Sequence, residues 1–118
     1  MDIFCKIINN EIPANTIYEE EIVKVFLDVN PSHNGHTLIV PKEHYQDLFD
    51  IDTEVLNHIL KIAKDIAELL KERLNYDGIS LCENNGYGQE VKHFHLHLIP
   101  KYKSEEKLPI EEVYNRLK

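Results

Sequence analysis

Apolar residues alternate with histidines between residues 91 and 100, and a period of two is typical of a half-buried β-strand. The apolar side chains of such a strand face a core. The imidazoles of His93, His95 and His97 would then line the opposite face, about 6–7 Å from one to the next. Clustered imidazoles most often serve as ligands, bases or nucleophiles, so we interpret this strand as the chemical centre of the chain. Its core-facing residues are Phe94, Leu96 and Leu98.

Four other short segments have the β-branched and aromatic composition of strands, and turn residues separate them. Residues 30–35 form a loop rich in turn residues, and residues 84–90 form a glycine-bearing loop immediately before the histidines. Pro41 should stop the third strand. The predicted strands cover residues 16–18, 22–28, 36–40 and 79–83.

Three segments have helical rather than strand periodicity. Asp2 can cap a short helix over residues 3–8, and residues 110–117 carry a weaker helical pattern. A long helix begins at Asp52 or Thr53, and Asp77-Gly78 closes it. Its apolar stripe predicts a core face made of Leu56, Ile59, Leu60, Ala63, Ile66, Ala67, Leu70 and Leu74.

Strands on both sides of one long helix predict the α+β class. We expect an antiparallel sheet of about five strands, with the long helix packed on one face and short helices at the termini. A chain of 118 residues is long enough for one domain with a single hydrophobic core. The imidazoles would open onto the sheet face away from the long helix.

Charge and composition narrow the function classes. A net charge of −8 disfavours a nucleic-acid binder, which needs a basic surface to meet the phosphates. The apolar runs are too short to cross a bilayer and the first residues lack a signal-peptide pattern, so we expect no membrane partner and a cytoplasmic location. Cys5 and Cys82 are too few for a disulfide framework, and Cys82 should be a buried thiol.

The loop that precedes the histidines adds a second chemical feature. Glycines let a backbone approach a ligand closely, and the short amide side chain of Asn84 offers donors to an oxyanion. Next to three in-line histidines, residues 84–90 are interpreted as one wall of a phosphate pocket.

The segment that contains the three histidines resembles the signature of a known protein family. Residues 88–100, Gly-Gln-Glu-Val-Lys-His-Phe-His-Leu-His-Leu-Ile-Pro, are similar to the signature of the histidine triad (HIT) family of nucleotide-binding hydrolases, and most of all to its small Hint-like bacterial members. Residues 3–8, 11–13, 26–28 and 35–44 resemble the earlier blocks of the family in the same order. The resemblance covers nearly the whole chain and implies a HIT-like fold.

The resemblance assigns roles to four histidines. His95 would be the nucleophile that attacks an α-phosphorus and forms a nucleotidyl-histidine intermediate, a role that suits an imidazole because it is largely neutral near pH 7. His97 would contact the phosphate and the leaving group. His93 and His36 would hold the tautomer and orientation of the nucleophile.

The resemblance also implies a nucleotide pocket. Asn84, Gly88 and Glu90 fall where the family places phosphate contacts. Apolar side chains would sandwich a purine, and Asp28 would accept hydrogen bonds from the ribose hydroxyls. Without the motif, the apolar members would be interpreted as core and Asp28 as a turn residue. The nucleoside pocket would comprise Ile3, Phe4, Ile7, Phe26, Asp28 and Val29.

Two features depart from the family pattern. The loop from Asn84 to Gln89 is shorter than usual, which leaves the roles of Asn84 and Asn85 open. Glu90 stands where many relatives have a small hydroxyl residue, and a carboxylate there would repel phosphate unless it turns outward or is protonated. Glu90 could contribute its backbone N–H or act as an acid toward the leaving group.

Some bacterial relatives hold a structural zinc ion with two cysteines and two histidines. The corresponding positions here are Asp2, Cys5, His44 and His93, still an acceptable tetrahedral donor set. A zinc ion that binds His93 would leave His95 and His97 as the working pair.

Three functions stay open from the sequence. The first is a phosphoramidase that cleaves a purine nucleoside monophosphate from an amine, with no cofactor required for catalysis. The second is a metal enzyme or zinc module in which His93, His95 and His97 bind one ion, which chelator sensitivity would distinguish. The third is a binding-only nucleotide protein. The resemblance also implies a homodimer. The long helix and residues 79–83 are the candidates for its interface, because a small sheet with an unprotected edge tends to pair.

Overall fold

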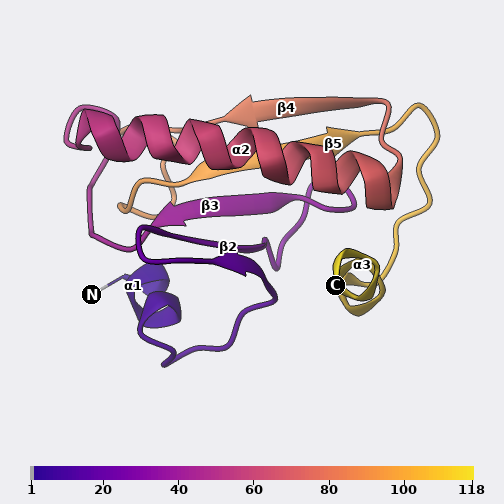
Figure 1. Ribbon diagram of the computed structural model, residues 1–118, viewed down its shortest axis with the longest axis horizontal. Coiled ribbons are helices and arrows are strands. Elements are labelled where there is room, and N and C mark those ends of the chain that lie inside the picture. Colours follow the sequence, from indigo (N-terminus) through magenta and orange to yellow (C-terminus); the bar gives the residue numbers. More distant parts are fainter. Residues whose placement is uncertain (1) are drawn as a thin grey trace.

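A five-stranded antiparallel sheet forms the centre of the structure, a computed structural model that describes residues 2–118 (Figure 1). The strand order is β1-β2-β3-β5-β4, and the long helix α2 lies across one face of the sheet. The predicted α+β fold class is confirmed. The elements are α1 (Ile3–Ile8), β1 (Thr16–Glu19), β2 (Val23–Leu27), β3 (Thr37–Pro41), α2 (Thr53–Leu74), β4 (Gly78–Cys82), β5 (Leu96–Lys101) and α3 (Ile110–Leu117).

The ends of α2 follow local capping chemistry. The helix begins at Thr53, as predicted, and the Asp52 side chain accepts hydrogen bonds from its first backbone N–H groups. At the other end Asn75 adopts the left-handed conformation with φ 51°, so the helix ends before the predicted Asp77-Gly78. Leu60 is 45% exposed, contrary to the predicted stripe, because Ile59, Ile62 and Ala63 already cover the sheet on that turn.

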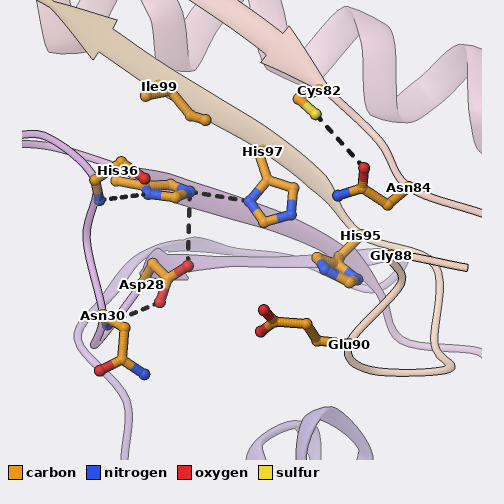
Figure 2. Close-up of a pocket in the computed structure, with 11 residues that line it drawn as sticks. Asp28, Asn30, His36, Cys82, Asn84, Gly88, Glu90, His95, His97 and Ile99 are labelled. Atoms are coloured by element: carbon orange, nitrogen blue, oxygen red, sulfur yellow. Dashed lines mark hydrogen bonds and ion pairs between the residues drawn. The ribbon is translucent and has the colours of Figure 1, made fainter.

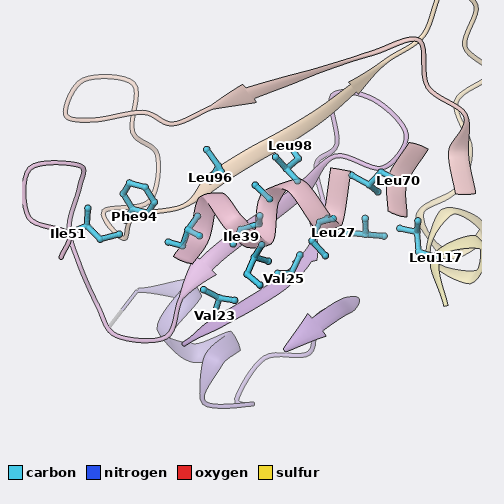
Figure 3. Packing of buried hydrophobic residues seen from close by; sticks show 14 of the residues in the cluster. Val23, Val25, Leu27, Ile39, Ile51, Leu70, Phe94, Leu96, Leu98 and Leu117 are labelled. Carbon is cyan, nitrogen blue, oxygen red and sulfur yellow. The ribbon is translucent and has the colours of Figure 1, made fainter. Parts of the chain in front are cut away.

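The sheet separates two hydrophobic clusters. The larger lies between the sheet and α2, and α3 closes it at one end (Figure 3). The smaller lies on the other face, where α1 packs against alternate residues of β2 and β3. The small cluster comprises Phe4, Ile7, Phe26, Leu38 and Val40.

The histidine strand is shorter than predicted. β5 begins at Leu96, opposite Ile39 of β3, so only His97 of the three histidines lies in a strand. The chain before it turns away, since the backbone N–H of Phe94 donates to the carbonyl of Tyr45 instead of joining the ladder. The alternation still holds for the apolar set, because Phe94, Leu96 and Leu98 belong to the larger cluster.

The edges of two strands also differ from the expectations. Pro41 is the last residue of β3 rather than the first beyond it. β4 is an edge strand that pairs only with β5, so Cys82 at its end is exposed and not buried. Within residues 2–118, no helix is both long and apolar enough to cross a bilayer.

Candidate active site

A cavity of about 320 Å³ opens beside β5, between the loop after β2 and the loop after β4 (Figure 2). It brings together seven of the residues singled out in the sequence: Asp28, His36, Asn84, Gly88, Glu90, His95 and His97. Sequence reasoning missed four further lining residues. Cys82 could have been found from strand pairing, since it lies opposite His97. The other three are Asn30, Ser32 and Ile99.

His95 is held in one tautomer. Its Nδ1 lies 2.7 Å from the backbone carbonyl oxygen of His93, and because a carbonyl only accepts, Nδ1 carries the proton. Nε2 therefore keeps its lone pair. Burial lowers the pKa of His95 below its ordinary value, which favours the neutral ring. The result is a neutral imidazole with one nucleophilic nitrogen, in a ring that lines the cavity.

His36 and His97 form a second, linked pair. The backbone N–H of Ser32 donates to Nδ1 of His36 over 3.0 Å, so His36 carries its proton on Nε2. That nitrogen lies 2.9 Å from Nδ1 of His97, which accepts, and His97 in turn carries its proton on Nε2. His36 thus orients His97 and not His95, and the expected tautomer support for His95 comes from the His93 carbonyl rather than from a ring.

The electrostatics keep this pair neutral. Burial, together with the neighbouring His95 and His36 rings, lowers the pKa of His97 to about 4. Burial also lowers the pKa of His36, although the charge of Asp28 opposes the shift. At neutral pH the pair therefore presents a hydrogen-bond donor and no positive charge.

Asp28 combines a turn role with a place in the cavity. Its Oδ1 accepts a hydrogen bond from the backbone N–H of Asn30 over 2.9 Å, and its Oδ2 lies 3.6 Å from Nε2 of His36. The side chain keeps 20% exposure toward the cavity. Asp28 is thus fixed in orientation while one carboxylate oxygen stays within reach of a ligand.

The loop after β4 distinguishes the two asparagines. Asn85 is engaged within the protein, since its Oδ1 accepts from the N–H of Leu48 and its Nδ2 donates to Glu83. Of the two, Asn84 is the one that lines the cavity. Gly88 has φ +95°, a conformation that other residues rarely adopt, and Glu90 lies exposed at the cavity wall.

The expected nucleoside pocket is only partly assembled. Phe4 packs edge-on against His95, with ring centroids 4.8 Å apart, while Ile7 and Phe26 lie in the small cluster beneath α1. Ile3 is 48% exposed and Val29 is 71% exposed. These five residues are not among the cavity-lining residues of the described chain.

Four side chains near the N-terminus form a separate donor cluster. Sγ of Cys5 lies 3.6 Å from Nδ1 of His44 and 3.5 Å from Nδ1 of His93, and Oδ2 of Asp2 lies 3.0 and 3.2 Å from the same nitrogens. These separations match the edges of a tetrahedron around a zinc ion. Nε2 of His93 donates to the carbonyl of Pro41, which leaves Nδ1 with its lone pair.

The charges of the cluster also suit a cation. Burial raises the pKa of Asp2, but the hydrogen bond from the N–H of Cys5 and the nearby His93 ring lower it by more. The net effect is a lowered pKa, so the carboxylate stays ionised. Burial and the charge of Asp2 raise the pKa of the Cys5 thiol. A bound metal ion would stabilise the thiolate, so the residues fit a structural zinc ion.

The three histidines do not share one ligand position. His93 belongs to the cluster with Asp2, while His97 groups with Asp28 and His36. Within residues 2–118, His95 belongs to neither donor group. The alternative in which all three rings bind one ion is therefore wrong for this fold.

Sequence comparison places the chain in a family. The HIT domain model matches residues 9–104, and the chain belongs to the HIT family. An uncharacterized HIT-like protein of Methanocaldococcus jannaschii is 49% identical over 107 residues, which cover 89% of this chain and 82% of that protein. Adenosine 5'-monophosphoramidase of Saccharomyces cerevisiae is 45% identical over 101 residues, 84% of this chain but 61% of the yeast protein.

Solved structures agree with this assignment. A Hit-like protein from Bartonella henselae superposes with a TM-score of 0.89 at 36% identity, covering 98% of this chain and 93% of that one. A zinc-bound histidine triad protein from Mycobacterium smegmatis gives a TM-score of 0.89 at 33% identity, over 98% and 88% of the two chains.

Proposed function

We propose that the protein is a nucleotide phosphoramidase, which hydrolyses the phosphorus–nitrogen bond of purine nucleoside 5'-monophosphoramidates through a nucleotidyl-His95 intermediate. The observation that carries the proposal is the fixed tautomer of His95, which leaves the lone pair on Nε2 of a ring that lines the same cavity as His97. The name of the S. cerevisiae relative supports the choice of substrate.

In the first step, Nε2 of His95 attacks the α-phosphorus of a substrate protonated on its nitrogen. The phosphorus–nitrogen bond breaks, the amine leaves neutral, and His95 becomes a nucleotidyl imidazolium with its Nδ1–H on the His93 carbonyl. The Nε2–H of His97 donates to the departing group as its lone pair develops, so it stabilises the transition state more than the ground state.

In the second step, water attacks the same phosphorus and returns a proton to solvent. Nε2 of His95 leaves as a neutral imidazole, and nucleoside monophosphate is released. Backbone N–H groups near Gly88 and the amide of Asn84 are the donors proposed for the phosphoryl oxygens, and Asp28 is the acceptor proposed for the ribose hydroxyls. No cofactor takes part in either step.

A zinc ion would be held by Asp2, Cys5, His44 and His93, and would supply a structural cross-link rather than chemistry. It would tie α1 to the segment that precedes β5. Because His93 orients His95 through its carbonyl, this cross-link would support the nucleophile from outside the cavity.

The decisive experiment mixes the protein with an adenosine 5'-phosphoramidate labelled on phosphorus and quenches in denaturant at alkaline pH. Released AMP and label on residue 95 support the proposal. His95→Asn should abolish both while leaving AMP affinity within about threefold, since it removes the nucleophile and little volume. Affinity without turnover in the wild-type protein would favour the binding-only alternative, and full turnover without label on residue 95 would exclude the intermediate.

We also propose a homodimer through the exposed edge of the sheet. β4 has one unpaired side, and Leu81 on it is 51% exposed, as is Leu60 of α2 at 45%. A second copy would pair the edge and cover these side chains. Sedimentation should give twice the chain mass for the wild type and a monomer for Leu81→Lys; a monomeric wild type would contradict this proposal.

A further inference from the structure

The loop that carries Ser32 is held by the segment between β5 and α3. Asn34 is 8% exposed, and its backbone and side chain form four hydrogen bonds with residues 102–108. Nδ1 of His33 lies 2.6 Å from Oε1 of Glu105 on the same segment. These contacts fix the position of the loop that contributes Asn30 and Ser32 to the cavity.

One side chain of this segment reaches the peptide that orients His36. Nζ of Lys107 lies 2.9 Å from the carbonyl oxygen of Pro31 and 3.1 Å from that of Ser32. The Pro31 carbonyl and the Ser32 N–H belong to the same planar peptide group, in which resonance couples oxygen and nitrogen. A cation on the oxygen therefore makes the N–H a stronger donor to Nδ1 of His36.

The chain of hydrogen bonds continues into the cavity. From the Ser32 N–H it passes to His36, and from Nε2 of His36 to Nδ1 of His97, 2.9 Å away. Each donor in such a chain polarises the next. The last donor is the Nε2–H of His97, the group that meets the departing atom in the reaction proposed above.

We propose that Lys107 is a positioning residue of the reaction, which acts through the Pro31–Ser32 peptide and His36 to strengthen the hydrogen bond that His97 donates to the leaving group. This inference rests on the proposed function for its chemical consequence. Asn34 and Glu105 hold the segment so that the Lys107 ammonium meets the peptide.

Substrates that differ only in the leaving group test the proposal. The developing lone pair of an aliphatic amine needs a donor far more than the weakly basic p-nitrophenolate does. Lys107→Met should therefore lower kcat about five- to tenfold for adenosine 5'-phosphoro-alkylamidate and less than about twofold for the p-nitrophenyl ester, with KM unchanged. Lys107→Arg, which keeps the cation, should restore most of the loss.

Lys103→Met is the matched control, because Lys103 is an exposed lysine of the same segment whose backbone N–H donates to Asp77, a bond that the substitution keeps. Lys103→Met should leave kcat unchanged for both the alkylamidate and the p-nitrophenyl ester. Equal losses for both substrates in Lys107→Met, or the same selective loss in Lys103→Met, would overturn the proposal.

Nitrogen-15 NMR of the histidines separates failure of this inference from failure of the proposed function. His36 and His97 should both show protonated Nε2, and Lys107→Met should shift the His36 Nδ1 resonance whatever the protein hydrolyses. An unchanged His36 resonance refutes the link. A shifted resonance in a protein without phosphoramidate turnover refutes only the enzymatic function.

Discussion

The rings of Phe4 and His95 meet edge to face, with centroids 4.8 Å apart and an interplanar angle of 74°. Phe4 belongs to α1, far from His95 in sequence, and it brings the small cluster into contact with the His95 ring. With the His93 carbonyl on Nδ1, this contact leaves the His95 ring little rotational freedom.

Phe4→Leu should therefore loosen the ring of His95, the proposed nucleophile. We expect a stability loss of about 1–2 kcal/mol and a fall in kcat of roughly tenfold, since small misplacements of a nucleophile are costly. Phe26→Leu is the control, because Phe26 packs in the same cluster and contacts Phe4 with centroids 5.8 Å apart. If urea unfolding gives similar losses for both variants and kcat falls equally, the Phe4 contact has no special role.

The half-buried His97 should make the protein less stable as the pH falls. An ordinary histidine takes up a proton near pH 6.5, whereas the pKa of His97 in the fold is about 4. Between these values the unfolded chain binds more protons, so the free energy of unfolding falls as the pH is lowered from 6.5 toward 4. We expect the titration of His97 to lower the free energy of unfolding by about 1–2 kcal/mol at pH 5.

Urea unfolding of wild type and His97→Gln at pH 7 and pH 5 measures this contribution. The variant should lose less stability than the wild type between the two pH values, because it lacks the ring whose protonation favours unfolding. Parallel losses would show that His97 titrates normally in the folded protein.

Features that depend on neighbouring residues could be predicted from the sequence, whereas features that depend on distant residues could not. The Asp2 and Asp52 caps involve neighbours in sequence, and both were predictable. The late start of the histidine strand, at Leu96, could not be predicted, because it depends on a hydrogen bond from the N–H of Phe94 to the carbonyl of Tyr45. Likewise, the partner that fixes His36 is a backbone N–H of Ser32, and no residue type marks it.

Lys24 is a second feature hidden from the sequence, a buried lysine in the middle of β2. It is 4% exposed, and its Nζ donates to the carbonyl of Ile7 and to Oδ1 of Asn10, and lies 3.7 Å from Glu19. These contacts attach the end of α1 to the sheet. The alternation of Lys24 with Val23 and Val25 alone would place its side chain on a solvent-exposed face of the strand.

Lys24→Met should cost about 1–3 kcal/mol of stability, because it removes the buried hydrogen bonds from Nζ to the Ile7 carbonyl, which keeps only the N–H of Asn10, and to Oδ1 of Asn10. The control is Lys42→Met, since Lys42 also pairs with Glu19 but keeps 28% exposure. Lys42→Met should lower the free energy of unfolding by less than about 1 kcal/mol. Equal unfolding midpoints in urea for the two variants would mean that burial of the Lys24 contacts is unimportant.

The cluster of Asp2, Cys5, His44 and His93 predicts a zinc content of about one ion per chain in protein purified without chelator, measured by plasma mass spectrometry. Chelation should lower the thermal midpoint by at least about 5 °C, since a ligand that binds only the folded state stabilises it. Phosphoramidate hydrolysis well below that midpoint should survive, because the cavity residues His95 and His97 lie outside the cluster.

Three variants distinguish this zinc site from adventitious metal. Cys5→Ser should lose the ion and most of the chelator effect, whereas Cys82→Ser, on the edge strand, should keep both. Asp2→Cys replaces a carboxylate with a thiolate, which zinc prefers, and should slow zinc release to a chelator. The same substitution removes the Asp2 cap of α1, so the zinc-free variant should be less stable than the zinc-free wild type. A protein that binds zinc equally well with and without the Cys5 thiol would place the ion elsewhere.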